Sequence, residues 1–237
     1  MEFKMSKKVG IICAVDLELA PFISHMENVK VTRESMLDLY EGEISGVPVA
    51  AVRCGVCKVN AAIAAQTLIR ECGADIVINA GTAGGMDKRL SLFDTVISTE
   101  TVYHDVEAHF LMEYHPRMDS VYFKADSELL RLSEIAVSKA GCADSTFFGR
   151  MATGEAFIDD DGRGEINDKY SPLTVDMESA AIAHVCYVNL VPFISIRSIT
   201  DTADHSGVGT FEENCEKASV IAKDVTVALL REIGAAG

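Results

Sequence analysis

Three carboxylates and one hydroxyl each follow a short apolar run, at the point where a buried strand is expected to end. They are Glu18, Thr82, Glu178 and Asp201. Ligands of open α/β sheets bind at the carboxyl ends of the strands, so we expect these side chains to share one edge of a sheet. Carboxylates gathered there can transfer protons and stabilise a developing positive charge. Taken singly, each residue has an ordinary explanation in a helix start or a turn, and only their joint placement indicates a site.

The elements that position these residues alternate along the chain. Apolar runs typical of buried strands are Lys8 to Val15, Asp75 to Ala80, Thr95 to Val102, Thr146 to Thr153, Leu173 to Asp176 and Phe193 to Ile199. A hairpin is predicted from Leu39 to Ile44 and Val47 to Arg53. Helices are predicted from Asp16 to about Met26, Lys58 to Cys72, Asp126 to Ala140, Glu178 to Val188 and Phe211 to Ile233. This order predicts a three-layer α/β/α fold around a central mixed sheet, with residues 1–237 as one domain.

The composition excludes several kinds of partner. The chain has 36 acidic and 21 basic residues, a net charge of −15, so we expect it to bind neither nucleic acid nor a membrane surface. Seven cysteines, an odd number mostly within apolar runs, indicate a reducing compartment. No apolar stretch approaches ~20 residues and the first eight residues are mainly polar, so neither a spanning helix nor a signal peptide is predicted. We therefore expect a cytoplasmic protein.

Several short motifs have residue types that occur in cofactor or metal sites. Gly81 to Gly85 can bring backbone N–H groups close to an anion or a sugar, but it lacks the spacing of a dinucleotide fingerprint or a P-loop. Cys54 and Cys57 have redox or zinc spacing, yet no second pair follows, and we interpret them as buried thiols. His104 to His109 is interpreted as a solvated loop and Asp159 to Asp161 as a charged surface turn. We therefore expect neither a metal nor a cofactor.

With those positions assembled, the sequence resembles the nucleoside phosphorylase and nucleosidase superfamily, most closely the 5′-methylthioadenosine/S-adenosylhomocysteine nucleosidases. The resemblance spans nearly the whole chain and depends on ordered blocks: Val9 to Ile12 with Glu18, Asn79 to Gly85, Tyr103 to Asp105, Gly154 to Ile158, Asp176 to Ala183 and Arg197 to Asp201. It implies a nucleoside phosphorylase-like fold and a homodimer that acts in methionine salvage. The implied reaction is hydrolysis of the N-ribosidic bond of 5′-methylthioadenosine or S-adenosylhomocysteine, which releases adenine.

The resemblance also implies residue roles. Asp201 matches the aspartate that protonates adenine N7, Glu18 the glutamate that activates water, and Glu178 the glutamate that holds the ribose hydroxyls beside the developing cation. The implied substrate-binding residues are Thr82, Ala83, Gly84, Phe110, Phe157, Ile158, Asp176, Met177 and Arg197. Phe110 belongs to the segment from Asp105 to Asp119, which is expected to cover the 5′ substituent across a dimer interface. Asp176 stands where the family more often has Glu, which leaves the preferred 5′ substituent open.

Two alternatives remain open at this point. A phosphate-dependent purine nucleoside phosphorylase needs cationic donors, and in related bacterial phosphorylases these are arginines after the first strand and before the Gly-Ser turn. Here those places hold Asp16 with Glu18, and Asn79, so hydrolysis is favoured. The second alternative is a non-catalytic purine-binding member of the superfamily. The presence of Glu18, Glu178 and Asp201 together argues against it.

Overall fold

Strands and helices alternate along most of the chain in a computed structural model that describes residues 7–203 and 207–236. The strands are β1 (Val9–Cys13), β2 (Glu27–Glu34), β3 (Leu37–Ile44), β4 (Val47–Arg53), β5 (Ile76–Gly85), β6 (Thr95–Tyr103), β7 (Phe123–Lys124), β8 (Thr146–Thr153), β9 (Thr174–Asp176) and β10 (Phe193–Asp201). The helices are α1 (Asp16–Ile23), α2 (Lys58–Arg70), α3 (Ala108–Glu113), α4 (Ser127–Ala140), α5 (Asp160–Tyr170), α6 (Ser179–Asn189), α7 (Val208–Ala236) and the short 3-10 helix η1 (Ala143–Ser145).

The strands form one mixed sheet, part of which closes on itself. β1 lies between β4 and β5 and runs parallel to both, and β10 runs parallel to β5 and antiparallel to β6. β9 joins β8 to β5, so β5, β10, β6, β8 and β9 form a ring. On the other side of β1, the strands β4, β3 and β2 extend the sheet as an antiparallel ribbon. The parallel strands β1, β5 and β10 therefore end at the same edge.

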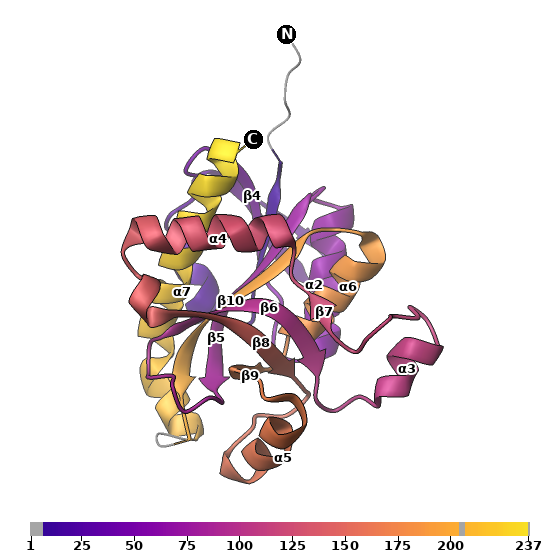
Figure 1. Cartoon of the computed structure of the whole chain (residues 1–237). Coiled ribbons are helices and arrows are strands. Elements are labelled where there is room, and N and C mark those ends of the chain that lie inside the picture. Colours follow the sequence, from indigo (N-terminus) through magenta and orange to yellow (C-terminus); the bar gives the residue numbers. More distant parts are fainter. Residues whose placement is uncertain (1–6, 204–206, 237) are drawn as a thin grey trace.

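Helices cover both faces of the sheet, and neighbouring residues of β1 show how. Ile11 packs in a core with side chains of α1, α4 and α7, whereas Ile12 packs in a second core with side chains of α2 and α6. Side chains alternate between the faces of a strand, which explains why a continuous apolar run is needed here. Figure 1 shows α4 and α7 on one side of the sheet and α2 and α6 on the other. The predicted α/β fold around a central mixed sheet is confirmed.

The helix α4 illustrates why several predicted boundaries agree with the structure. The Asp126 side chain accepts hydrogen bonds from the backbone N–H groups of Glu128 and Leu129, both at 3.0 Å, and so caps the helix start. The helix ends at Gly141, whose φ of 71° is the left-handed conformation that glycine adopts without strain. These local signals are readable in the sequence.

Other predictions were wrong in part. The helix α1 ends at Ile23 rather than at about Met26. The strand predicted to end at Ala80 continues through Gly81 to Gly85, which belong to β5. The run from Asp159 to Asp161 is not a surface turn, since α5 begins at Asp160. The polar loop after β6 contains α3, and β2 was missed altogether. The wrong turn prediction matters most, because α5 supplies a side chain of the candidate site.

In the ranges 7–203 and 207–236, no helix is both long and apolar enough to cross a membrane.

Candidate functional site

A cavity of about 200 Å³ lies at the carboxyl ends of β1, β5, β9 and β10. Of the residues predicted to form the site, Glu18, Thr82, Ala83, Gly84, Phe157, Ile158, Asp176, Met177, Glu178 and Asp201 line this cavity. Arg197 and Phe110 do not. The remaining lining residues are Ala14, Val15, Val56, Ala156, Val175, Thr200 and Phe211. Strand ends and the loops that follow them thus bring together side chains that are far apart in the sequence.

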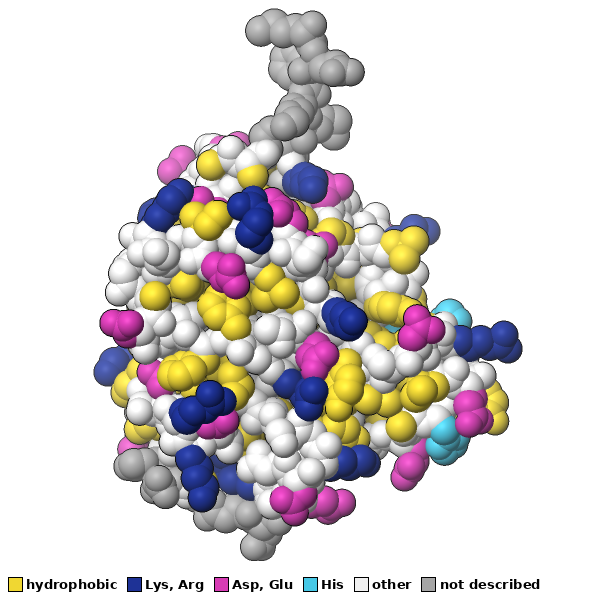
Figure 2. Space-filling model, in the orientation of Figure 1, with side chains coloured by type: hydrophobic (Ala, Val, Ile, Leu, Met, Phe, Trp, Pro, Cys, Tyr) yellow, Lys and Arg dark blue, Asp and Glu magenta, His cyan; other side chains and the backbone are white. Residues whose placement is uncertain are grey.

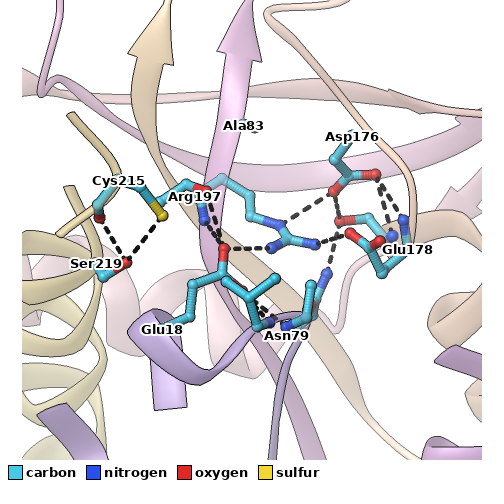
Figure 3. A network of polar contacts seen from close by, with 12 residues as sticks. Glu18, Asn79, Ala83, Asp176, Glu178, Arg197, Cys215 and Ser219 are labelled. Carbon is cyan, nitrogen blue, oxygen red and sulfur yellow. Dashed lines mark hydrogen bonds and ion pairs between the residues drawn. The ribbon is translucent and has the colours of Figure 1, made fainter. Parts of the chain in front are cut away.

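Arg197 lies behind the cavity, fully buried, in contact with three carboxylates (Figure 3). Its Nε is 3.1 Å from Asp176 Oδ2 and its Nη2 is 3.1 Å from Glu178 Oε2. Its Nη1 is 3.8 Å from Glu18 Oε1. Burial lowers the pKa of Arg197, but the three carboxylates together raise it by more. The net shift is upward, and the side chain stays charged. Arg197, predicted to bind substrate, lies outside the lining of the cavity, and its contacts orient the three carboxylates. We call these four residues the Arg197 cluster.

Glu18 is held by backbone and side-chain donors. Its Oε1 accepts hydrogen bonds from the Thr82 N–H at 2.7 Å and the Thr82 hydroxyl at 2.9 Å, and its Oε2 accepts from the Ala14 N–H at 2.7 Å. Glu18 is also in the first turn of α1, where the helix dipole favours negative charge. A Cβ at Gly81 would collide with the Glu18 carboxylate, which explains the glycine there. The Thr82 N–H, predicted to approach a ligand, instead orients this carboxylate.

Asp176 and Glu178 both precede α6, Asp176 as the last residue of β9 and Glu178 directly before the helix. Burial raises the pKa of Glu178 to about 7, although Arg197 opposes the shift. The carboxylate of Asp176 accepts hydrogen bonds from the Thr153 hydroxyl at 2.6 Å and the Ser179 N–H at 3.1 Å. Asp176 therefore acts mainly as a structural acceptor, whereas Glu178 can change its protonation near neutral pH.

Asp201 belongs to a second ionic contact, separate from the Arg197 cluster. Its Oδ2 accepts a hydrogen bond from Arg163 Nη2 at 2.8 Å, and its Oδ1 accepts from the Thr200 hydroxyl at 2.9 Å. Both charged side chains are buried. Burial raises the pKa of Asp201, while Arg163 and Thr200 lower it, and the net shift is upward. We call Asp201 and Arg163 the Asp201 pair. Sequence reasoning missed Arg163 because it lies in a helix without an apolar stripe.

The loop that carries the apolar wall of the cavity is fixed by ionic contacts. The Phe157 ring lies edge-on to Phe211, with ring centroids 6.4 Å apart. Just before Phe157, the Glu155 N–H donates to Asp105 Oδ2 at 2.9 Å, and Lys58 Nζ lies 2.9 Å from Asp105 Oδ1. The Tyr103 to Asp105 block, singled out in the sequence, thus anchors this loop.

Phe110 lies outside the cavity, on α3, with 52% of its surface exposed. Met112 and Tyr114 beside it are also exposed. The structure of one chain therefore does not bring this apolar cluster to the site. In the part of the chain that the structure describes, no three His, Cys, Asp or Glu side chains are arranged to hold a metal ion.

A family model for the phosphorylase superfamily matches residues 8–231. The chain belongs to the phosphorylase superfamily. Among solved structures of this superfamily, it is similar to the 5′-methylthioadenosine/S-adenosylhomocysteine nucleosidase of Neisseria meningitidis in complex with methylthio-immucillin-A. That chain is 31% identical with a TM-score of 0.87, over 95% of this chain and 99% of that one.

Two further solved structures agree. The 5′-methylthioadenosine/S-adenosylhomocysteine nucleosidase of Colwellia psychrerythraea, in complex with adenine, is 28% identical with a TM-score of 0.86, over 97% of this chain and 96% of that chain. The corresponding nucleosidase of S. pneumoniae, with a transition-state inhibitor, is 27% identical with a TM-score of 0.86, over 94% of this chain and 98% of that chain. A futalosine hydrolase of Helicobacter pylori, 21% identical with a TM-score of 0.88, shares the fold. The nucleoside phosphorylase-like fold is confirmed.

Proposed function

We propose that this protein, acting as a single domain, hydrolyses the N-ribosidic bond of 5′-methylthioadenosine or S-adenosylhomocysteine. The products are adenine and the 5′-thio-substituted ribose. The similarity to nucleosidases along the whole chain supports this reaction. The observation that carries the proposal is the cavity itself, which presents Asp201 and the carboxylates of the Arg197 cluster to one space.

The chemistry of the bond explains the need for both groups. Cleavage places positive charge on the ribose and negative charge on the departing adenine, so the base needs a proton and the sugar needs nearby anions. Asp201 is the proposed acid at adenine N7, and the upward shift of its pKa by burial favours the protonated form. Glu178 is the proposed anion beside the ribose, and Glu18 the base that activates water.

The remaining lining residues are proposed to hold the nucleoside. Phe157 would stack on adenine while the Ile158 backbone contacts its edge, and Met177 would lie along the ribose. Thr82, Ala83, Gly84 and Asp176 would complete the walls.

The cavity also distinguishes water from phosphate as the attacking group. In the described part of the chain, no Lys or Arg side chain lines it, and Asn79 is fully buried. Phosphate recognition depends on cationic donors, so this lining favours hydrolysis over phosphorolysis.

We further propose a homodimer in which the segment from Asp105 to Asp119 covers the 5′ substituent of the neighbouring subunit. Figure 2 shows hydrophobic side chains on the side of the molecule that carries α3. The helices α2, α3 and α6 contribute to one core cluster, and the exposed apolar side chains on or next to them are Val59, Ile63, Phe110, Met112, Tyr187, Val188 and Leu190. Apolar surface of this kind is typical of a protein interface. Sedimentation equilibrium tests the proposal, because a monomer at working concentration would contradict it.

We place this activity in the cytoplasm, in methionine salvage. All seven cysteines are free thiols, which agrees with a reducing compartment. A methionine auxotroph that lacks its own nucleosidase and is fed methylthioadenosine offers a test, because complementation is expected and failure of an expressed, active protein would contradict the role.

Product analysis tests the reaction. The protein is incubated with methylthioadenosine, adenosylhomocysteine, 5′-deoxyadenosine and inosine, each with and without phosphate. We expect adenine and a free reducing sugar from the first two substrates, at rates that do not depend on phosphate. A ribose 1-phosphate derivative as the main product would establish phosphorolysis, and the absence of any cleavage would contradict the proposed hydrolysis.

A further inference from the structure

The residue before α2 has a backbone conformation that side chains rarely allow. Cys57 has φ of 83° and ψ of 162°. This region of conformational space is almost restricted to glycine, and any other residue there is strained. Strain of this kind persists only when the surrounding structure fixes it, and it is concentrated at functional sites. The question is which contact the strained backbone makes.

The Cys57 N–H points at the proposed ribose-facing glutamate. It donates a hydrogen bond to Glu178 Oε1 at 3.1 Å, across 121 residues of sequence. The other oxygen of Glu178, Oε2, lies 3.1 Å from Arg197 Nη2. Each oxygen of this carboxylate is therefore held by a separate element, Oε1 by the start of α2 and Oε2 by β10. The N–H of the next residue, Lys58, also donates to a glutamate, Glu155, whose Oε1 lies 3.3 Å away.

The thiol of Cys57 has no comparable contact. Its Sγ lies 3.9 Å from the Glu155 carbonyl oxygen. Burial and the Glu155 contact raise the pKa of this thiol, so it remains protonated and poorly nucleophilic. The backbone of Cys57, rather than its side chain, carries the contact with the site.

We propose that Cys57 is a positioning residue whose strained backbone directs its N–H at Glu178 and so fixes this carboxylate beside the ribose. The inference rests on the proposed function for its catalytic consequence. Its structural part stands apart from that function, because strain and the orientation of Glu178 are properties of the protein alone.

A displaced N–H would change the protonation of Glu178. Three charged groups face this carboxylate, Arg197 from β10, Asp176 from β9 and Glu18 from α1, and the Cys54 thiol also lies near. The N–H favours the ionised form, so its loss raises the pKa of Glu178 above its present value of about 7. Since ionised Glu178 is the form that stabilises the ribose cation, activity would then begin only at higher pH.

Three substitutions at Cys57 distinguish the effect of its backbone conformation from the effect of its thiol. Cys57→Gly relieves the strain, Cys57→Ala removes the thiol and keeps the strain, and Cys57→Val adds a branched side chain that the conformation cannot hold. We expect Cys57→Gly to raise the unfolding midpoint by about 2–4 °C and to retain kcat. Cys57→Ala should stay within about twofold of the parent, and Cys57→Val should lower kcat on the order of tenfold with a smaller change in KM.

Cys142→Val is the matched control, because it makes the same exchange at a half-buried thiol with an ordinary φ of −111°. It should leave kcat unchanged. A loss in Cys57→Ala as large as in Cys57→Val, or a tenfold loss in Cys57→Gly, would assign the effect to the thiol and overturn the proposal. If Cys57→Val does not fold, the comparison of Cys57→Gly with Cys57→Ala decides. A higher unfolding midpoint for Cys57→Gly supports the proposal, and the reverse order contradicts it.

A carbon-13 NMR titration of Glu178 provides a readout that is independent of turnover. We expect Glu178 to titrate at higher pH in Cys57→Val than in Cys57→Gly and the parent. Identical titrations would contradict the positioning role even if the variants differ in activity. Conversely, the three proteins could show these titrations while the parent cleaves no methylthioadenosine. That result would contradict the proposed function and leave the positioning role in place.

Discussion

Two buried arginines hold the acidic side chains of the cavity, one in the Arg197 cluster and the other in the Asp201 pair. Arg197 contacts Glu18, Asp176 and Glu178, so the Arg197 cluster keeps an excess of negative charge when all three are ionised. Arg163 contacts Asp201, so within the Asp201 pair one cation faces one carboxylate. An excess of negative charge suits a place where a cation develops. A pair of one cation and one carboxylate suits a group that must gain and lose one proton.

The two arginines also come from different kinds of element. Arg197 is on β10, in the middle of the sheet, and its side chain is fully buried. Arg163 is on α5, a helix that projects beyond the sheet in Figure 1. The comparison indicates a rigid frame for the carboxylates near the ribose and a frame for the acid that depends on one peripheral helix. Three changes test this difference and a fourth tests the proposed dimer, from the largest expected effect to the smallest.

Replacing the acid should have the largest effect. Asp201→Asn should lower kcat for methylthioadenosine by about 10²- to 10⁴-fold, because an amide can donate a hydrogen bond to N7 but cannot deliver a proton. Folding, checked by circular dichroism, and adenine binding, measured by calorimetry, should be retained. Asp87→Asn, the same exchange outside the cavity, is the control. Turnover within a few-fold of the parent would remove Asp201 from the acid role.

Removing the cation of the Arg197 cluster should have the largest effect on stability. Arg197→Met leaves three carboxylates without their buried partner and should lower the free energy of unfolding by about 3–5 kcal/mol. Arg163→Met removes the cation beside Asp201, and this carboxylate can take up a proton, so the loss of unfolding free energy should be smaller. Urea unfolding at neutral pH measures both. Equal losses would contradict the comparison between the two arginines.

The contact within the Asp201 pair should affect the pH dependence of activity. Arg163 lowers the pKa of Asp201, so its removal must raise this pKa. The reaction needs protonated Asp201 and is lost as pH rises through its pKa, so Arg163→Met should keep activity to higher pH. Arg163→Lys, which retains the charge, should keep the parent profile. A basic limb of kcat/KM that does not move in Arg163→Met would show that the pair does not tune the acid.

The smallest expected effect concerns the exposed cluster on α3. Joint replacement of Phe110 and Met112 by alanine should cost roughly 1–3 kcal/mol of transition-state binding with methylthioadenosine. It should cost less with 5′-deoxyadenosine, which lacks the thioether. Dilution below the dimer dissociation constant should reproduce this loss of preference. Equal losses on both substrates would show that the cluster packs only on its own subunit.

The helices and strands that could be predicted from the sequence are those marked by neighbouring residues, such as an apolar run or a capping side chain. β8 matches its predicted bounds, and α4 begins one residue after its predicted start, because an apolar run and a capping aspartate are visible in the sequence. β2 was missed because every residue in it is exposed and its apolar alternation is limited to Val29 and Val31. α5 was missed because Asp and Gly at its start indicate a turn more strongly than a helix.

The same distinction holds for the site. The strand-end carboxylates could be predicted, since the end of an apolar run is visible and parallel strands end at a common edge. The contact of Arg163 with Asp201 could not, because it depends on how α5 packs against the sheet. The contact of the Cys57 N–H with Glu178 could not either, because a positive φ at a non-glycine residue leaves no trace in the sequence.

The central claim is that the carboxylates of this cavity activate water against the ribose. Cleavage of methylthioadenosine in water enriched in oxygen-18, with phosphate present in excess, tests it most directly by mass spectrometry of the sugar. We expect one oxygen-18 atom in the free methylthioribose, no sugar phosphate, and loss of the signal in Glu18→Gln. A methylthioribose 1-phosphate product without the label would contradict the claim.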